Sequence, residues 1–228
     1  MSTAILEKFR FNLPRGLARR VLPGFLTLIA MVMILLICGA MQPRIWSQNG
    51  LTLIMSPIVA LAIASMAQMV MMSIGDIDLG IGFFVGMITT IVATLLRETP
   101  ILGVLALAGS VLAYALLGAL VQLRSVPSLI ATLGASFVWL GMGLFVLPVP
   151  GGSAPDWLFA YAFWQPPLSI PAPLVTMVVA TALTWFVTRR TALGVRFRSL
   201  GSNPVALMRS GGSLVVTRML AYGTVGLL

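Results

Sequence analysis

The sequence contains no histidine, one cysteine (Cys38) and one lysine (Lys8) among its 228 residues. The missing histidine excludes cysteine–histidine zinc sites and histidine-dependent catalytic triads. A single cysteine cannot form a disulfide bond within the chain. A nucleotide-binding P-loop needs a Gly-Lys-Ser/Thr sequence, whereas Lys8 lies between Glu7 and Phe9. We therefore expect no catalytic residue, metal or cofactor in this chain, and we expect any ATP-driven step to belong to another subunit.

Charged residues are also scarce. They make up 8% of the chain, whereas 59% of the residues are hydrophobic and the mean hydropathy is +1.07. A soluble globular domain needs more polar surface than this composition supplies. The sequence therefore predicts an all-α integral membrane protein, a bundle of helices that crosses the bilayer several times.

Apolar runs of about 20 residues, the length of a membrane-spanning helix, occur six times. They cover residues 21–41, 51–73, 81–96, 101–123, 126–147 and 173–188. The first is too long for the apolar core of a signal peptide, so we interpret it as an uncleaved span. A seventh begins near residue 218 and reaches only about 16 Å by residue 228. We expect a basic segment at 1–20 and one transmembrane domain at 21–228, and we interpret the chain as C-terminally short.

The net charge of +9 would suit a nucleic-acid partner, but the basic residues lie at the ends of the apolar runs. This pattern is typical of membrane orientation, since loops on the cytoplasmic side are rich in arginine and lysine. With the N-terminus in the cytoplasm, only Arg44 and Arg97 of the 14 basic residues lie outside. The sequence therefore predicts a cytoplasmic N-terminus, an external loop at 148–172 and a cytoplasmic loop at 189–217. It also predicts that the chain lies in a lipid bilayer and does not bind nucleic acid.

Two carboxylates, Asp76 and Asp78, interrupt an otherwise uncharged stretch between residues 45 and 96. Charge among so many apolar residues is costly, so it usually has a role. Three glycines flank the pair, namely Gly75, Gly80 and Gly82. Glycine lets the backbone leave the helix, and a helix that breaks at membrane depth usually lines a cavity or a path. We therefore predict a broken or re-entrant segment near 75–82.

The roles of these two carboxylates remain open at this stage. Asp78 near a helix N-terminus can cap it by accepting backbone N–H bonds, or it can contact a solute, and we favour the cap. Asp76 is expected to be less constrained and to lie in headgroup water. Either carboxylate also suits the binding of a proton or a sodium ion in an ion-driven carrier.

A short capped helix is predicted within the cytoplasmic loop. Asn203 is a favoured N-cap, Pro204 suits the first helical position, and Gly211 or Gly212 suits the C-terminal cap. The helix carries four residues with apolar surface to bury: Val205, Ala206, Leu207 and Met208. Two interpretations stay open, a handle for a separate motor subunit or a helix lying on lipid headgroups.

The external loop is rich in proline and aromatic residues. The aromatic residues are Trp157, Phe159, Tyr161, Phe163 and Trp164. They suit an aromatic belt at the membrane interface, and they also suit a docking rim for an external partner.

Three segments, in this order, resemble the membrane permeases of bacterial ABC importers for ribose, xylose and related monosaccharides. Residues 75–82, Gly-Asp-Ile-Asp-Leu-Gly-Ile-Gly, are similar to that family's Gly-Gly-Ile-Asp-Leu-Ser-Val-Gly. Residues 126–134, Val-Pro-Ser-Leu-Ile-Ala-Thr-Leu-Gly, are similar to its Val-Pro-Pro-Phe-Ile-Ala-Thr-Leu-Gly. Their shared positions include Pro127, Thr132 and Gly134. The third segment has Thr-Ala-Leu-Gly at 191–194, Leu-Gly-Ser-Asn-Pro at 200–204 and Ser-Gly at 210–211, where the family has Thr-x-Phe/Leu-Gly, a Gly-Gly-Asn-Pro-like turn and Ala-Ala-Arg-x-Ser-Gly.

The resemblance implies a permease subunit in the bacterial inner membrane that transports a monosaccharide-like solute. It implies three protein partners: a cytoplasmic ABC ATPase, a periplasmic solute-binding protein, and a second permease copy or a paralogue. It also implies that the third segment is the loop that couples the permease to the ATPase. The residues of that loop are Gly201, Asn203, Pro204, Leu207, Arg209, Ser210 and Gly211.

The sequence departs from the family at two positions of the first motif. Asp76 replaces a glycine and Gly80 replaces a serine, whereas Asp78 matches the family's aspartate. These departures concern the solute more than the fold. The paired carboxylates and the short seventh span leave two alternatives to the importer open. One is an ion-coupled secondary transporter that uses Asp76 or Asp78, and the other is a non-transporting, truncated permease fragment.

The predicted orientation can be tested by thiol labelling. On a Cys38→Ser background, we expect a membrane-impermeant thiol reagent to label Ser153→Cys in intact spheroplasts. We expect the reagent to label Ser210→Cys only after the membrane is permeabilised, because loops rich in arginine and lysine face the cytoplasm. Labelling of Ser210→Cys in intact spheroplasts would contradict the orientation.

Overall fold

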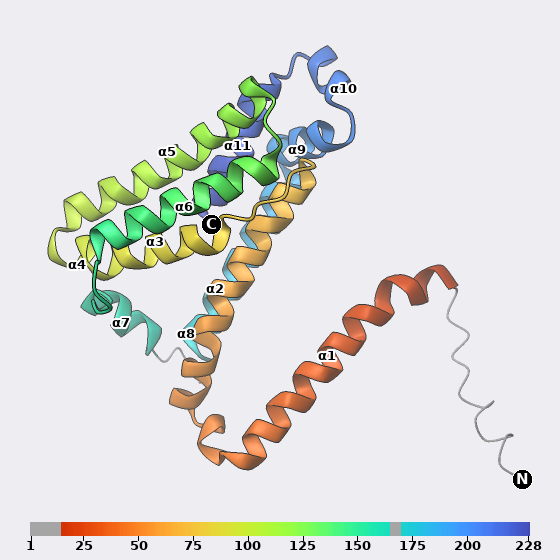
Figure 1. Cartoon of the computed structure of the whole chain (residues 1–228). Coiled ribbons are helices and arrows are strands. Elements are labelled where there is room, and N and C mark those ends of the chain that lie inside the picture. The colour runs from red at the N-terminus through yellow and green to blue at the C-terminus, as the bar shows by residue number, and fades with distance from the viewer. Residues whose placement is uncertain (1–14, 165–169) are drawn as a thin grey trace, which may run out of the picture. The chain divides into compact units, whose positions relative to one another are not determined.

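The computed structural model describes residues 15–164 and 170–228, and every regular element in these residues is a helix. In chain order (Figure 1) they are α1 (Arg15–Met41), the 3-10 helix η2 (Pro43–Trp46), α2 (Gln48–Ser73), α3 (Ile81–Ala93), α4 (Leu95–Glu98), α5 (Pro100–Arg124), α6 (Ser128–Val146), α7 (Asp156–Ala162), α8 (Ala172–Arg190), α9 (Ala192–Ser202), α10 (Pro204–Arg209) and α11 (Leu214–Leu227).

Six helical segments of the described residues are long and apolar enough to cross a membrane. They are Gly24–Met41, Asn49–Ser73, Ile81–Glu98, Pro100–Arg124, Ser128–Val146 and Ala172–Arg190. The third consists of α3 followed directly by α4. The prediction of an all-α protein that crosses the membrane several times is confirmed.

The chain divides into two compact units, Met1–Leu51 and Thr52–Leu228. In the first unit, the indole ring of Trp46 in η2 lies against Gly39 in α1, where a side chain would overlap it. The absence of a side chain at Gly39 therefore lets η2 fold back onto the end of α1. Most of α2 and all of the helices from α3 to α11 belong to the second unit.

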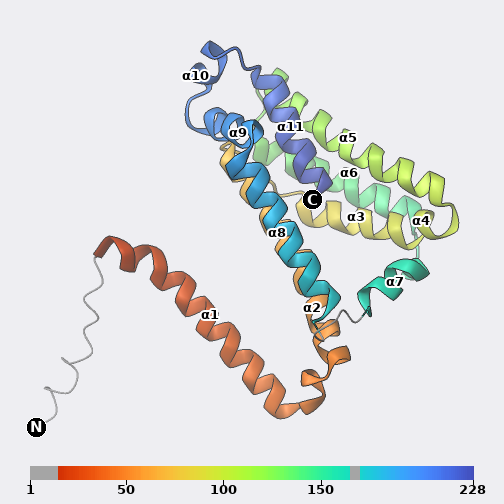
Figure 2. The same ribbon diagram turned by 180° about the vertical axis from the view of Figure 1, so that it is seen from behind.

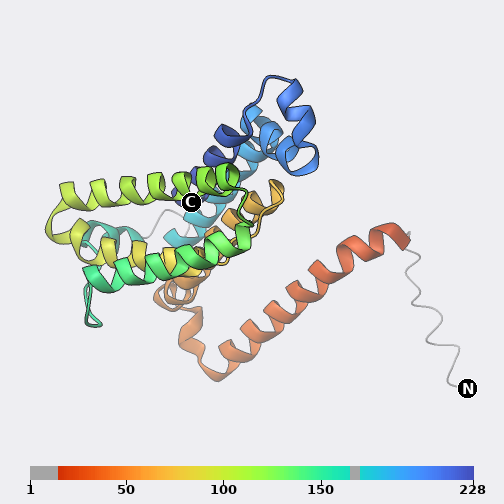
Figure 3. The same cartoon turned by 45° about the horizontal axis from the view of Figure 1, so that its top comes forward.

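In the second unit, α11 packs along α5 and α3 packs along α6, and these four helices lie side by side (Figures 1 and 3). Gly118 in α5 explains how closely α11 can approach. A Cβ atom added at Gly118 would lie 2.8 Å from Cγ of Tyr222 and 2.9 Å from the carbonyl oxygen of Arg218. Small residues at helix contacts let two backbones approach closely in lipid, where packing drives association.

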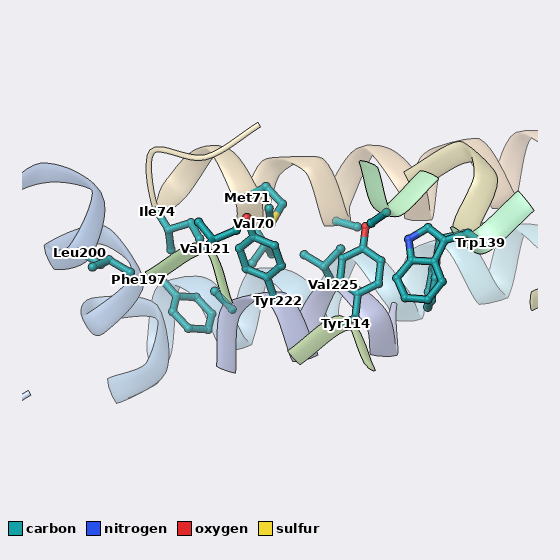
Figure 4. Close-up of a cluster of buried hydrophobic side chains, with 14 of the residues drawn as sticks. Val70, Met71, Ile74, Tyr114, Val121, Trp139, Phe197, Leu200, Tyr222 and Val225 are labelled. Atoms are coloured by element: carbon teal, nitrogen blue, oxygen red, sulfur yellow. The ribbon is translucent and has the colours of Figure 1, made fainter. Parts of the chain in front are cut away.

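A continuous cluster of buried side chains runs through this unit (Figure 4). From Leu200 and Phe197 in α9, the cluster passes Met71 in α2 and Tyr222 in α11 and reaches Tyr114 in α5 and Trp139 in α6. The rings of Tyr114 and Trp139 are stacked, with centroids 5.8 Å apart and planes 9° from parallel. Phe84 and Leu207 add α3 and α10 to this cluster, so the core connects α2, α3, α5, α6, α9, α10 and α11.

The two ends of this unit differ in composition. Helices α9 and α10 lie at one end, whereas α4 and α7 lie at the other (Figure 2). The end with α9 and α10 carries the arginines of the last turns of α8 and α10, together with those of α9. These are Arg189, Arg190, Arg196, Arg198 and Arg209. The positive-inside rule would place this arginine-rich end at the cytoplasmic side, and this orientation stays a prediction.

Helix α7 carries several of the aromatic residues of the loop that the sequence predicts to be external. Its side chains Trp157 and Phe159 are exposed, and the hydroxyl oxygens of Tyr161 and Thr176 are 2.8 Å apart, which ties α7 to α8. The exposed aromatic residues suit both interpretations of the loop, the interfacial belt and the docking rim.

The contact between α5 and α11 can be tested with two glycines of the same helix. We expect Gly118→Ala to lower the free energy of unfolding by about 1–3 kcal/mol, because the added methyl group overpacks the contact with Tyr222. Gly109→Ala is the control, since a Cβ there meets nothing within 4 Å. It should leave stability unchanged or raise it by up to about 1 kcal/mol. Tryptophan fluorescence during unfolding by SDS in mixed micelles measures both, and equal stabilities would contradict the packing.

Candidate functional site

The broken or re-entrant segment predicted near residues 75–82 corresponds to a non-helical segment between α2 and α3. Helix α2 ends in a turn in which Gly75 has φ +82°, a left-handed conformation that favours glycine. The N–H of Asp76 donates to the carbonyl oxygen of Met71, and that of Gly75 donates to Met72, both at 3.1 Å. This pair of bonds forms the glycine C-cap of a helix. Residues 74–80 are therefore non-helical, and we call them the break.

Helix α6 supplies partners for the backbone of the break. The N–H of Ile77 donates to Oγ of Ser128 at 3.4 Å, and the N–H of Leu79 donates to Oγ1 of Thr132 at 3.1 Å. Ser128 and Thr132 are one helical turn apart, so both hydroxyls lie on one face of α6. A Cβ at Gly80 would lie only 2.7 Å from the carbonyl oxygen of Thr132. The first two motifs therefore pack directly against each other.

Asp78 is 4% exposed and has two internal partners. Its Oδ1 accepts the N–H of Gly80 at 2.7 Å, and its Oδ2 accepts the hydroxyl of Tyr114 in α5. Gly80 is the residue before α3, so Asp78 satisfies a backbone N–H at the start of that helix. This is the geometry that a capping role requires.

Asp76 is 6% exposed, so the expectation that it is less constrained and lies in headgroup water is wrong. Its Oδ2 lies 3.2 Å from Nε of Arg218, and Nη2 of Arg218 donates to Oδ1 at 3.4 Å. The hydroxyl of Tyr222 donates to Oδ2 at 3.2 Å. A buried carboxylate needs such partners, because an unpaired charge would be far more costly.

Sequence reasoning did not identify Arg218, Tyr222, Ser128 or Tyr114 as partners of the break. The signal was available in part: Arg218 and Tyr222, like Ser128 and Thr132, are four residues apart on one helix and share a face. The neighbour of each pair depends on contacts between residues as far apart as 146 positions, which the linear sequence does not reveal.

A polar pocket of about 400 Å³ lies beside Asp76. Its polar lining consists of Asp76, Gln122, Ser125, Ser128 and Arg218. An apolar pocket of about 580 Å³ lies between α2, α3, α5 and α11. The polar pocket offers a carboxylate, a guanidinium, an amide and hydroxyls, which are groups that bind polar solutes.

The capped helix that the sequence predicted within residues 189–217 is present as α10. Oδ1 of Asn203 accepts the N–H of Ala206 at 3.0 Å, and Pro204 occupies the first helical position. At the other end, Gly211 has φ +82° and its N–H donates to the carbonyl oxygen of Met208 at 3.0 Å. Both caps are those that the sequence predicted.

The side chains of α10 point in different directions. Leu207 is 3% exposed and lies against Gly212, so it anchors the helix to the protein. Val205 and Met208 are each 50% exposed, and Arg209 is exposed. The surface that α10 offers is therefore part apolar and part basic.

Gly201, near the end of α9, lies against the start of the break. A Cβ there would overlap the carbonyl oxygen of Ser73 and lie 2.9 Å from the carbonyl carbon of Ile74 and 3.1 Å from the amide nitrogen of Gly75. Only a residue without a side chain permits this approach. The third segment of the sequence therefore contacts the first.

The structure brings together part of the predicted site. Gly75, Asp76, Asp78, Gly80, Thr132 and Gly201 form or border the break. Gly82 and Gly134 face open space, and Pro127 is the N-cap residue of α6. Asn203, Pro204, Leu207, Arg209, Ser210 and Gly211 form or follow α10.

Comparison with curated proteins finds relatives over most of the chain. The probable ABC transporter permease protein YphD of Escherichia coli is 31% identical over 90% of this chain, and the autoinducer 2 import system permease protein LsrD of Enterobacter sp. is 27% identical over 87%. The galactofuranose transporter permease protein YtfT of Escherichia coli is 28% identical over 96%.

These alignments cover 62–65% of the relatives, so the chain spans less than two thirds of their length. No protein-family profile matches the chain, and no solved structure does. The relatives confirm the resemblance to the permease subunits of sugar ABC importers that the three motifs predicted.

The bond between Tyr114 and Asp78 can be tested by removing one hydroxyl. We expect Tyr114→Phe to lower the free energy of unfolding by about 1–3 kcal/mol, because a buried carboxylate oxygen loses its donor. Tyr161→Phe removes an exposed hydroxyl and should have a clearly smaller effect. Denaturation in detergent micelles compares the two variants, and equal losses would contradict the assignment.

Asp78→Asn provides a second test of the capping role. We expect this variant to reduce the amount of folded protein, measured by size-exclusion chromatography in detergent, more than it changes solute affinity in the fraction that folds. A selective loss of solute affinity with normal folding would indicate direct contact with the solute instead.

Proposed function

We propose that this chain is the permease subunit of a bacterial ABC importer and moves a monosaccharide-like solute across the inner membrane. A cytoplasmic ATPase, a periplasmic solute-binding protein and a second permease copy or paralogue complete the assembly. The observation that carries the proposal is the contact of Gly201 with the Ser73–Gly75 turn. It joins α9, which leads directly into the surface helix α10, to the non-helical segment between two membrane-spanning helices.

Helix α10 is the part of the chain that the ATPase would hold. Six residues alone would not form a stable helix in water, but two caps and the buried side chain of Leu207 keep this one ordered. The exposed Val205, Met208 and Arg209 suit a partner groove with an apolar floor and an acidic rim.

Transport would proceed by alternating access. When the ATPase subunits close on ATP, α10 would move and carry α9 with it. Gly201 would transmit that movement to the turn at Gly75, and the break would change its position against α6. A non-helical segment with few backbone bonds of its own reorients at lower cost than an intact helix.

The solute is proposed by analogy with the relatives, whose names include autoinducer 2 and galactofuranose. The polar groups around the pocket beside Asp76 suit a hydroxyl-rich molecule of that kind. The external binding protein would contribute most of the solute selectivity.

The ion-coupled alternative is less well supported. Asp76 is paired with Arg218, and Asp78 accepts bonds from Gly80 and Tyr114. A carboxylate whose oxygens already have internal partners offers a poor site for a transported ion.

The role of α10 can be tested by reversing the chemistry of its exposed surface. We expect Met208→Asp combined with Arg209→Glu to lower copurification with the ATPase, and uptake, by about tenfold or more, because charge replaces apolar surface and repels the acidic rim. The matched control is Met208→Leu with Arg209→Lys, which keeps both properties. Normal ATPase association and uptake in the first variant would show that α10 is not the contact.

The energy source separates an ABC importer from an ion-driven carrier. In cells that express the complete transport system, we expect uptake to persist when a protonophore removes the proton gradient while ATP stays high. Depletion of ATP should abolish it. Uptake that follows the proton gradient and not ATP would support the carrier instead.

A further inference from the structure

The salt bridge between Asp76 and Arg218 joins two elements that are 142 residues apart. Asp76 is 6% exposed and the side chain of Arg218 is 19% exposed, so both charges are largely removed from solvent. A buried ion pair often adds little stability over apolar residues of similar size, whereas removal of one partner is strongly destabilising. The main effect of this pair is therefore to fix the position of the break relative to α11.

Both neighbours of Asp76 in the chain have contacts of their own. Gly75 lies in the turn that Gly201 of α9 touches, and the N–H of Ile77 donates to Ser128 of α6. The backbone on either side of Asp76 is thus held by two other helices, and the Asp76 side chain adds a third, α11, through Arg218.

Two routes lead from α10 to this position. One runs back along the chain through α9 to Gly201 and the turn at Gly75. The other runs forward through Ser213, whose side chain caps α11 by accepting the N–H of Val216 at 3.3 Å. The contact between Asp76 and Arg218 joins the ends of these routes and closes a ring that contains α9, α10, α11 and the break.

The ring also connects to the rest of the bundle. Arg218 begins the stretch of α11 that packs against Gly118 of α5, where the two backbones are close. Tyr222, one turn further along α11, donates to the same carboxylate of Asp76. A movement of α11 relative to the break would therefore separate the charges of a buried pair.

We propose that Asp76 and Arg218 are a positioning pair for transport, which makes the break and the α5–α11 layer move together when α10 is displaced. The inference rests on the proposed function. With the pair intact, the two routes from α10 act on one rigid ring. Without the pair, α10 still binds its partner, but the break and α11 move independently and ATP hydrolysis loses its connection to uptake.

The experiment compares Asp76→Asn, Arg218→Gln and Arg218→Lys in the complete transport system reconstituted into liposomes. Uptake and ATP hydrolysis are both measured per folded complex. We expect Asp76→Asn and Arg218→Gln to lower the uptake per ATP by about tenfold while the ATPase remains bound and active. Arg218→Lys keeps the charge and should keep most of the wild-type ratio. Arg124→Gln removes an exposed arginine at the end of α5 and is the control.

An unchanged uptake per ATP in both neutral variants would overturn the proposal. A loss of uptake that only follows the amount of folded complex would also overturn it, because the pair would then be merely structural. Failure of Arg218→Lys to keep more of the ratio than Arg218→Gln would show that the charge is not what matters.

Failure of the proposed function would look different, since the wild-type chain itself would then show no ATP-dependent uptake. In that case, a double-mutant cycle on the detergent-solubilised chain tests the pair separately. We expect the effects of Asp76→Asn and Arg218→Gln on the unfolding midpoint to be clearly non-additive. Additive effects would overturn the pairing.

Discussion

One constraint governs this structure: the non-helical residues 74–80 lie between apolar helices, and their backbone N–H and carbonyl groups need hydrogen-bond partners. An N–H or carbonyl group without a partner is very costly in lipid, so a break in a span survives only where protein supplies hydrogen bonds. Here Gly75 closes the end of α2, and Ser128 and Thr132 of α6 accept N–H groups of the break. The position of α6 follows from this requirement, as does the pairing of the first two motifs.

The buried carboxylates extend the same requirement to charge. Asp78 bonds to Gly80 and Tyr114, and Asp76 bonds to Arg218 and Tyr222, so each connects the break to another helix. Without partners, these carboxylates would destabilise an apolar interior. With their partners, they specify which helices lie beside the break. A segment held by a few polar contacts can also shift between positions more readily than a packed helix. The proposed transport cycle would depend on such a shift.

Several features were predictable because they depend on neighbours in the sequence. Asn203, Pro204 and Gly211 predicted α10 with both caps, and the glycines around Asp76 predicted the non-helical segment between α2 and α3. The role of Asp76 was not predictable, and the expectation that it lies in headgroup water was wrong. Its partner Arg218 is 142 residues away, and a span predicted from hydropathy has no preferred neighbour until the helices pack.

The sequence by itself determined the membrane class, the approximate bounds of six spans and the caps of α10. Hydropathy, propensity and capping act over about one to five helical turns, so a linear pattern carries them. Only the tertiary structure decided that Gly201 touches the Ser73–Gly75 turn, that α6 serves the break and that α11 neutralises Asp76. Such contacts depend on which faces of the helices meet, and that choice is made by packing of the whole bundle, not by any segment alone.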